Sequence, residues 1–166
     1  DPALNPERAR PALRQARQPV RIGEALQGGA SRPMVVAEAE PAAEGVLRLR
    51  LKAADGHALP RWTPGSHIDL QCGSTGLSRQ YSLCGDPQDT GSYEIAVLRE
   101  ANGRGGSAWV HEHLHRGAKV QVRGPRNHFP LDEGASHLIL VAGGIGITPI
   151  SAMARRARAL GLSYEI

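Results

Sequence analysis

The chain has 166 residues, of which 40% are hydrophobic and 4% aromatic, with 20 glycines, 12 prolines and a formal net charge of +4. Its basic residues are scattered and are not interleaved with aromatic residues, which argues against a nucleic-acid-binding protein. No apolar stretch is long enough to cross a bilayer and no signal-peptide core is present, so we expect a turn-rich cytoplasmic protein.

Residues 1–31 are expected to form a flexible N-terminal extension. Four prolines within the first 19 residues interrupt any helix, and Gln27–Ser31 is a run of small and polar residues. The pattern changes at Met34, where the first strand-like segment begins.

Residues 32–133 are predicted to fold as a small antiparallel β-barrel. Short segments of alternating apolar and polar residues are joined by Gly/Pro turns, which is typical of such a barrel. One helix interrupts them near Ser107–His115. The predicted strands cover residues 34–37, 45–51, 78–84, 93–99, 119–123 and the second half of 62–70.

Residues 134–166 are predicted to open an α/β domain. Leu138–Ala142 is a continuous apolar run, which is typical of a parallel strand covered on both faces. A glycine-rich turn follows, then a helix over 150–160 with Pro149 in its first turn and Gly161 as its stop. The predicted fold class is therefore mainly β: an antiparallel barrel with one helix, followed by the first β-α-β elements of a second domain.

The strand at Arg79–Leu83 carries the first candidate site residues. Alternation places Arg79, Tyr81 and Leu83 on one face and Ser82 on the other. A flat redox ring with a phosphate tail needs a bidentate cation, an aromatic side chain against the ring and a hydroxyl near its reactive edge. The strand supplies all three, although an ordinary solvent-facing edge strand would look the same.

Two glycine-rich segments carry the other candidates. Gly105 and Gly106 bring backbone amides close to a ligand, and Ser107 is expected to cap a helix whose N-terminus attracts phosphate. The turn at Gly143–Pro149 lacks the G-x-G-x-x-G spacing but suits close approach to a nucleotide. A capped helix after a loose turn and glycines needed only for packing are the respective alternatives.

Taken together and in this order, these segments resemble the ferredoxin–NADP reductase superfamily. The branch they resemble is that of phthalate dioxygenase reductase-like proteins, the reductase components of Rieske-type aromatic oxygenases and demethylases. The resemblance covers about residues 34–166. It is carried by Arg79–Leu83, Gly105–Ser107, Gly124–Leu131 and Gly143–Pro149.

The resemblance implies a flavin-binding barrel over 32–133 and FMN rather than FAD as its cofactor. Arg79, Ser107 and the amides of the glycines before Ser107 would bind the phosphate, while Tyr81 packs on the ring and Ser82 bonds near its reactive nitrogen. The implied flavin-binding residues are Arg79, Tyr81, Ser82, Leu83, Val97, Leu98, Gly105, Gly106 and Ser107.

The resemblance also implies that 134–166 begins a nicotinamide-nucleotide domain. Gly143, Gly144 and Gly146 would admit the nucleotide, and Thr148 would lie between flavin and nicotinamide, so that Ser82 and Thr148 flank the reacting atoms. The implied reaction passes electrons from NADH through the flavin towards an iron–sulfur centre and a partner Rieske-type oxygenase, and the chemistry is orientation of donor and acceptor.

The sequence departs from this family in its extent. It stops early in the nucleotide domain, and we expect the [2Fe–2S] centre in a C-terminal domain outside it, since Cys72 and Cys84 form no iron–sulfur cluster motif. A bare apolar edge after residue 134 allows self-association. We expect no metal site and no catalytic role for the seven histidines. The alternative function is a flavin-binding module without turnover.

Overall fold

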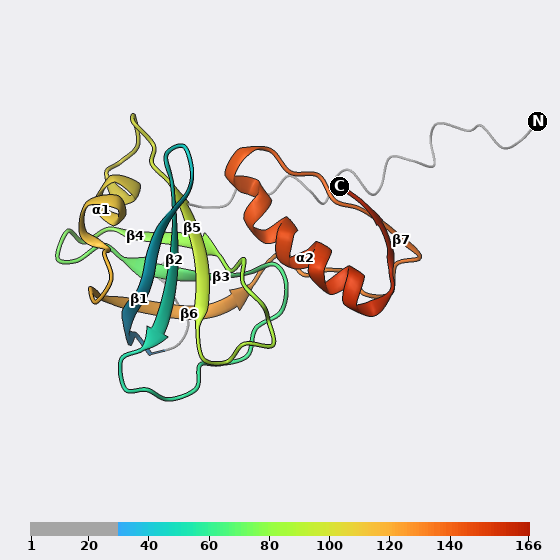
Figure 1. The fold of residues 1–166 in the computed structure, drawn as a ribbon, viewed down its shortest axis with the longest axis horizontal. Helices are drawn as coiled ribbons and strands as arrows, with labels where there is room; N and C mark the ends of the chain where they lie inside the picture. Colours follow the sequence, from blue (N-terminus) through green and yellow to red (C-terminus); the bar gives the residue numbers. More distant parts are fainter. Residues whose placement is uncertain (1–29) are drawn as a thin grey trace, which may run out of the picture.

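The structure is a computed structural model that describes residues 30–166, so most of the expected N-terminal extension lies outside the described residues (Figure 1). Six antiparallel strands curl into a half-barrel in the order β4-β3-β6-β1-β2-β5, and a separate parallel pair, β7-β8, follows. The elements are β1 Arg32–Ala43, β2 Val46–Ala53, β3 Ser66–Gln71, β4 Ser78–Ser82, β5 Tyr93–Leu98, α1 Gly106–His113, β6 Lys119–Asn127, β7 His137–Ile139, η3 Gly144–Gly146, α2 Ile147–Leu160 and β8 Ser163–Glu165.

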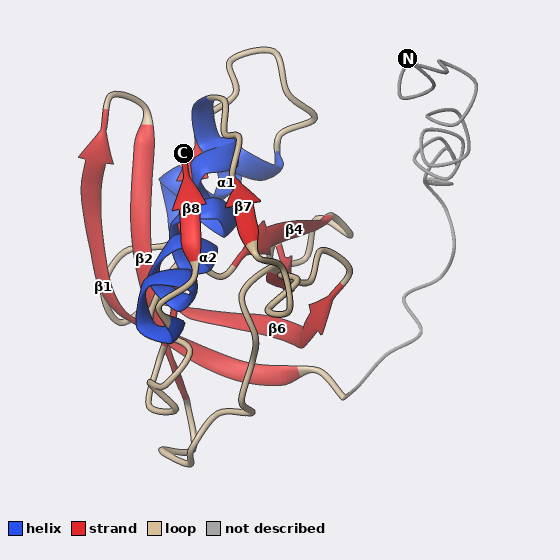
Figure 2. Cartoon of the chain, turned by 90° about the vertical axis from the view of Figure 1, so that its right-hand side faces the viewer, coloured by secondary structure: helices blue, strands red, loops and turns tan. Residues whose placement is uncertain are grey.

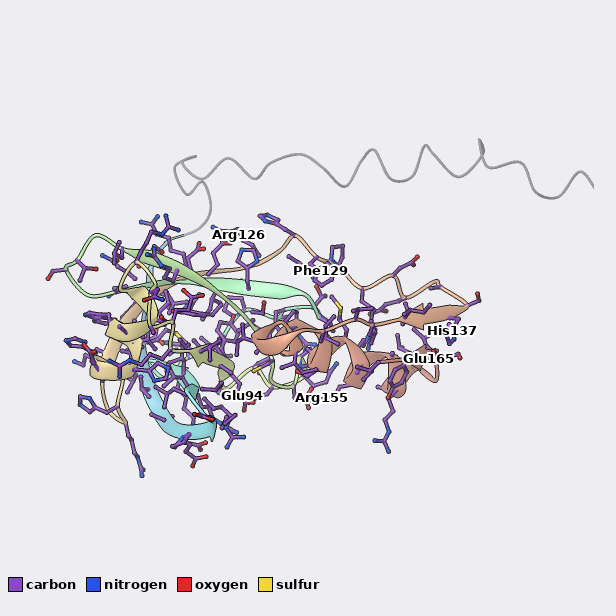
Figure 3. All side chains as sticks on the ribbon, turned by 90° about the horizontal axis from the view of Figure 1, so that it is seen from above. Glu94, Arg126, Phe129, His137, Arg155 and Glu165 are labelled. Carbon is purple, nitrogen blue, oxygen red and sulfur yellow. The ribbon has the colours of Figure 1, made fainter. Side chains whose placement is uncertain are left out.

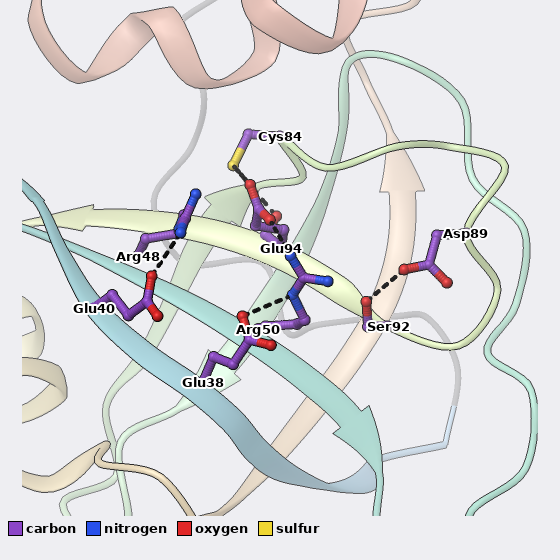
Figure 4. Close-up of polar contacts among 8 residues, drawn as sticks. All are labelled: Glu38, Glu40, Arg48, Arg50, Cys84, Asp89, Ser92 and Glu94. Carbon is purple, nitrogen blue, oxygen red and sulfur yellow. Dashed lines mark hydrogen bonds and ion pairs between the residues drawn. The ribbon is translucent and has the colours of Figure 1, made fainter.

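Alternation along the strands separates a buried face from a charged face. In β2, Leu49 and Leu51 are fully buried, whereas Arg48 and Arg50 face outward. Each arginine lies opposite a glutamate of β1, with Arg48 paired to Glu40 at 2.7 Å and Arg50 to Glu38 at 3.2 Å (Figure 4). Exposed pairs of this kind add little to stability, but opposite charges facing one another favour this register.

The two edge strands of the half-barrel approach each other at one end. Beyond β4, the amide of Leu83 donates to Ser66 O at 2.9 Å, and the amide of Cys84 donates to Glu94 O of β5 at 2.9 Å. The buried Tyr93 anchors the same end, because its hydroxyl donates to Pro60 O at 2.7 Å. The sheet thus bends far enough for β4 and β5 to form opposite walls of one opening.

The expected β-α-β elements follow the barrel (Figure 2). β7 and β8 pair in parallel, and α2 packs on them through Leu140, Ile150 and Met153. Gly161 ends α2 in the left-handed conformation, with φ 69°, as predicted. The expectation that Leu138–Ala142 is covered on both faces is wrong, since Ile139 and Val141 are 73% and 80% exposed.

Helix α2 also contacts the barrel. Ala152 is fully buried and belongs to the barrel's hydrophobic cluster, although it lies on α2. At the same junction, Glu94 of β5 and Arg155 of α2 line one polar hollow (Figure 3). Within residues 30–166, no helix is long and apolar enough to span a membrane.

Candidate functional site

A cleft of about 350 Å³ lies where the barrel meets the first turn of α2. The three segments singled out in the sequence all reach it, although they are far apart along the chain. Its lining residues are Arg79, Gln80, Tyr81, Ser82, Ala96, Leu98, Glu100, Arg104, Gly106, Ser107, Ile145, Gly146, Thr148 and Pro149.

Arg79 is seated against the start of α1 because Gly106 has no side chain. A β-carbon at Gly106 would lie 2.6 Å from both Cγ and Nε of Arg79, which is closer than non-bonded atoms approach. One guanidinium nitrogen, Nη1, donates to Ser78 O at 2.8 Å. The other, Nη2, is buried and has no acceptor among the described residues. Such an orphaned cationic donor is costly unless a ligand oxygen satisfies it.

Tyr81 and Ser82 follow Arg79 on the same wall of the cleft. Tyr81 packs partly against the barrel's hydrophobic cluster, and burial raises the pKa of its hydroxyl to about 12. The hydroxyl therefore stays protonated at neutral pH. Ala96 and Leu98 of β5 face them across the opening. This wall offers an aromatic ring, a hydroxyl and apolar side chains to a planar ligand.

The start of α1 differs from the expected capped helix. Gly105, with φ 84°, occupies the N-cap position, and no side chain caps the helix. The prediction that Ser107 is the cap is wrong, because Ser107 is already the second residue of the helix, two positions after the N-cap. Its Oγ instead accepts a hydrogen bond from the Glu100 amide at 3.1 Å, which ties the helix to the preceding loop. Gly106 and Ser107 nevertheless line the cleft.

The segment Ile145–Pro149, at the start of α2, forms a third wall of the cleft. Thr148 is buried, and its Oγ1 donates to Ile145 O at 2.9 Å. That bond closes the short 3₁₀ turn η3 onto α2, so the hydroxyl hydrogen is already committed. Gly146 lines the cleft, whereas Gly143 and Gly144 do not, and Gly144 adopts φ 53°. In this turn, Gly146 exposes backbone to the cleft, and Gly144 adopts the left-handed conformation.

The remaining predicted residues lie elsewhere. The side chains of Leu83 and Val97 are fully buried in the barrel core, and Gly105 is beside the cleft but not part of its lining. Two charged residues, Glu100 and Arg104, were missed. The sequence could have indicated Arg104, because this residue lies within the glycine-rich run that precedes α1.

Cysteines and histidines near the cleft have protein partners or are buried. Cys72 and Cys84 are both unpaired and buried, and burial raises the pKa of the Cys84 thiol to about 11. On α1, the ring of His113 bonds to Trp109 O. Across residues 30–166 no group of three or more His, Cys, Asp or Glu side chains is arranged to hold a metal ion.

Comparisons with known proteins agree with this geometry. The family described as "Oxidoreductase FAD-binding domain" matches residues 33–130. Among curated relatives, the tert-butanol monooxygenase / tert-amyl alcohol desaturase reductase subunit of Aquincola tertiaricarbonis is 52% identical over 112 residues, covering 68% of this chain and 33% of that protein. The chain spans about a third to two fifths of the length of the curated relatives it matches.

Two solved structures extend the comparison. Phthalate dioxygenase reductase, described as modular for electron transfer from pyridine nucleotides to [2Fe-2S], has 41% identity and a TM-score of 0.77, with 81% of this chain and 42% of that chain covered. An intact type IV self-sufficient cytochrome P450 monooxygenase has 52% identity and a TM-score of 0.80, with 100% of this chain and 21% of that chain covered. The predicted resemblance and the mainly β fold are confirmed, and the chain belongs to the family of oxidoreductase FAD-binding domains.

Proposed function

We propose that the cleft binds a flavin and that the whole protein uses it to carry electrons from a nicotinamide nucleotide to an oxygenase. The observation that carries this proposal is the convergence of three distant segments on one cleft. Together they offer a cation for a phosphate, an aromatic residue and a hydroxyl for a planar ring, and an open glycine turn beside them.

The residues present fit a flavin phosphate. The buried Nη2 of Arg79 has no acceptor among residues 30–166, and a phosphate oxygen would supply one. Gly106 leaves its amide and the space beside Arg79 open, and Ser107 adds a hydroxyl. We propose FMN rather than FAD, because the phthalate dioxygenase reductase-like branch that the chain resembles is expected to use FMN. Arg79 and Arg104 are the cations on the cleft lining.

Further along the β4 wall, Tyr81 would pack against the ring and Ser82 would donate to its reactive edge. A bound flavin supplies two-electron acceptance from a nicotinamide and one-electron release to a metal centre. The chain's part is to orient the two reactants, since neither Ser82 nor Thr148 needs to move a proton for a hydride to transfer. At the start of α2, Gly146 and Thr148 would leave room for NADH beside the flavin.

The terminal electron acceptor has two candidates. The similarity to phthalate dioxygenase reductase supports a [2Fe–2S] centre and then a Rieske-type oxygenase. The similarity to a self-sufficient cytochrome P450 supports a haem mono-oxygenase domain, and it covers 100% of this chain against 81% for the reductase. We favour the haem domain, because that similarity also has the higher identity, 52% against 41%. The gene sequence on both sides of this region decides between them.

The experiment that tests flavin binding is direct. Purified chain should be yellow, or become yellow with added FMN, and mass spectrometry of the heat-released cofactor should find FMN. FAD would refute the choice of FMN, and no affinity for any flavin would refute the proposed site. Anaerobic bleaching of the flavin by NADH then separates an electron-transfer function from a flavin-binding module without turnover.

Two further proposals concern organisation. We propose a boundary near residues 132–134 between the flavin-binding barrel, residues 32–133, and the start of the nucleotide-binding domain. We also propose that the exposed apolar side chains of Ile139 and Val141 support self-association of the chain.

A further inference from the structure

We propose that His111 is a positioning residue of the flavin site, because its ring fixes helix α1 against strand β5. The inference rests on the proposed function and assigns a role within the same cleft. His111 does not line the cleft, and no step of electron transfer requires its imidazole. Its role follows from what its ring holds together.

The geometry identifies the donor. Nε2 of the half-buried His111 lies 2.8 Å from Val97 O. A carbonyl oxygen only accepts, so Nε2 carries the hydrogen and donates it in both the neutral and the protonated ring. The contact therefore does not depend on the protonation state of the imidazole.

Both ends of this bond belong to elements that build the cleft. Val97 lies between Ala96 and Leu98, which line the cleft from β5. His111 lies about one helical turn after Gly106 and Ser107, which line it from the start of α1. The bond thus joins strand β5, proposed to contact the ring, to helix α1, whose start is proposed to contact the phosphate.

The other polar side-chain contacts between α1 and the residues just after β5 are exposed. The ion pair between Arg99 and Glu112 measures 2.7 Å, but its side chains are 50% and 52% exposed, so water and salt screen it. The bond from the Glu100 amide to Ser107 Oγ is also exposed. Val110 anchors α1 in the barrel's hydrophobic cluster, and His111 adds the partly buried hydrogen bond that sets the position of the helix against β5.

The distance between α1 and β5 matters because FMN would contact the start of α1 with its phosphate and the strands with its ring at the same time. When one ligand engages two subsites, the second contact is intramolecular, and its benefit is lost if the subsites are misplaced. Riboflavin has the same ring but no phosphate, so it would engage the strands β4 and β5 and not the start of α1. Loosening α1 should therefore weaken FMN binding and leave riboflavin binding unchanged.

The test compares dissociation constants of FMN and riboflavin for the 166-residue chain, measured by quenching of flavin fluorescence. His111→Leu removes the donor and should weaken FMN binding about two- to tenfold, the usual effect of one lost hydrogen bond, with riboflavin unchanged. His111→Gln keeps an amide donor of similar reach and should recover most of the loss. His113→Leu, on the same helix but bonded only within it, is the matched control and should bind FMN like the wild type.

Three results would overturn the inference: an unchanged FMN constant in His111→Leu, equal weakening of both ligands, or no recovery in His111→Gln. If His111→Leu fails to fold, His111→Asn, which is polar but too short to reach Val97, takes its place with the same expected loss. A wild-type chain that binds no flavin refutes the proposed function, and the inference with it. A wild-type chain that binds FMN leaves the variants to decide the inference alone.

Discussion

Replacing Gly106 with alanine should weaken FMN binding by displacing Arg79. The new β-carbon would lie 2.6 Å from two atoms of the Arg79 side chain. Ordinary contact between heavy atoms needs about 3.5–4.0 Å, so the arginine must move by roughly 1 Å. Because the atoms it meets belong to a long, flexible side chain, the arginine and not the backbone should shift, and the fold should survive.

The size of the effect follows from what the guanidinium is expected to bind. A charge-assisted contact to a phosphate contributes about 1.5–3 kcal/mol, or about ten- to a hundredfold in the dissociation constant. Arg79→Ala should lose this whole amount. Gly106→Ala should lose most of it, since a bidentate contact does not tolerate a shift of roughly 1 Å. Arg79→Lys should recover part, because an ammonium cannot reproduce the fork.

The assay is a flavin titration of the purified variants, beside urea unfolding. Gly117→Ala is the control for backbone strain: its φ is 89°, and no atom lies within 4 Å of the added carbon. It should cost about 1 kcal/mol of stability and leave FMN affinity unchanged. Arg79→Ala with Gly106→Ala should bind no more weakly than Arg79→Ala alone. Additive losses, or wild-type affinity in Gly106→Ala, would show that Gly106→Ala does not act by displacing Arg79 from the phosphate; unchanged affinity in Arg79→Ala would show that Arg79 does not hold it.

Three further predictions address stability and association. Burial raises the pKa of the Cys84 thiol from 9.0 to about 11, so the thiol ionises first in the unfolded state, and the free energy of unfolding should fall between pH 9 and 11. In urea melts, Cys84→Ala should reduce that fall by about 2 kcal/mol. An unchanged dependence of the unfolding free energy on pH would contradict this. Arg126 pairs with Asp69, which is only 2% exposed, so Arg126→Met should cost about 3–5 kcal/mol, and a loss below about 1 kcal/mol would count against a buried pair. If the apolar face drives self-association, Val141→Lys should shift the chain to monomer in size-exclusion chromatography, and an unchanged profile would exclude that face.

The sequence predicted those parts of the fold that depend on local signals. Pro149 and Gly161 mark the first turn and the end of α2, and both signals act within a few residues. The length of β1 was not predicted, because the expected strand ended at residue 37. β1 continues to Ala43 since Glu38 and Glu40 meet arginines of β2, a pairing between strands that no local pattern reveals.

The motifs identified three segments that line the cleft, but not every residue that lines it. Alternation along a strand sends neighbours to opposite faces, so Val97 enters the core while Ala96 and Leu98 reach the cleft. The position of Ser107 depended on which residue began α1, and helix boundaries are uncertain by one or two residues. Glu100 came to the cleft through the tertiary arrangement of its loop, which one sequence does not encode in a recognisable pattern.

The contact between α2 and the barrel fixes the position of the cleft wall that α2 provides. Ala152 is fully buried within the barrel's hydrophobic cluster, and Ile145, Gly146 and Thr148 line the cleft at the start of the same helix. Interiors pack densely, so a helix whose middle is buried in the barrel cannot shift its first turn freely. The wall proposed to face the nicotinamide is therefore fixed by the same core that fixes Tyr81 and β5. The packing within residues 30–166 thus fixes the three walls of the cleft relative to one another, and that is the part of the proposed orientation of donor and acceptor that this chain would supply.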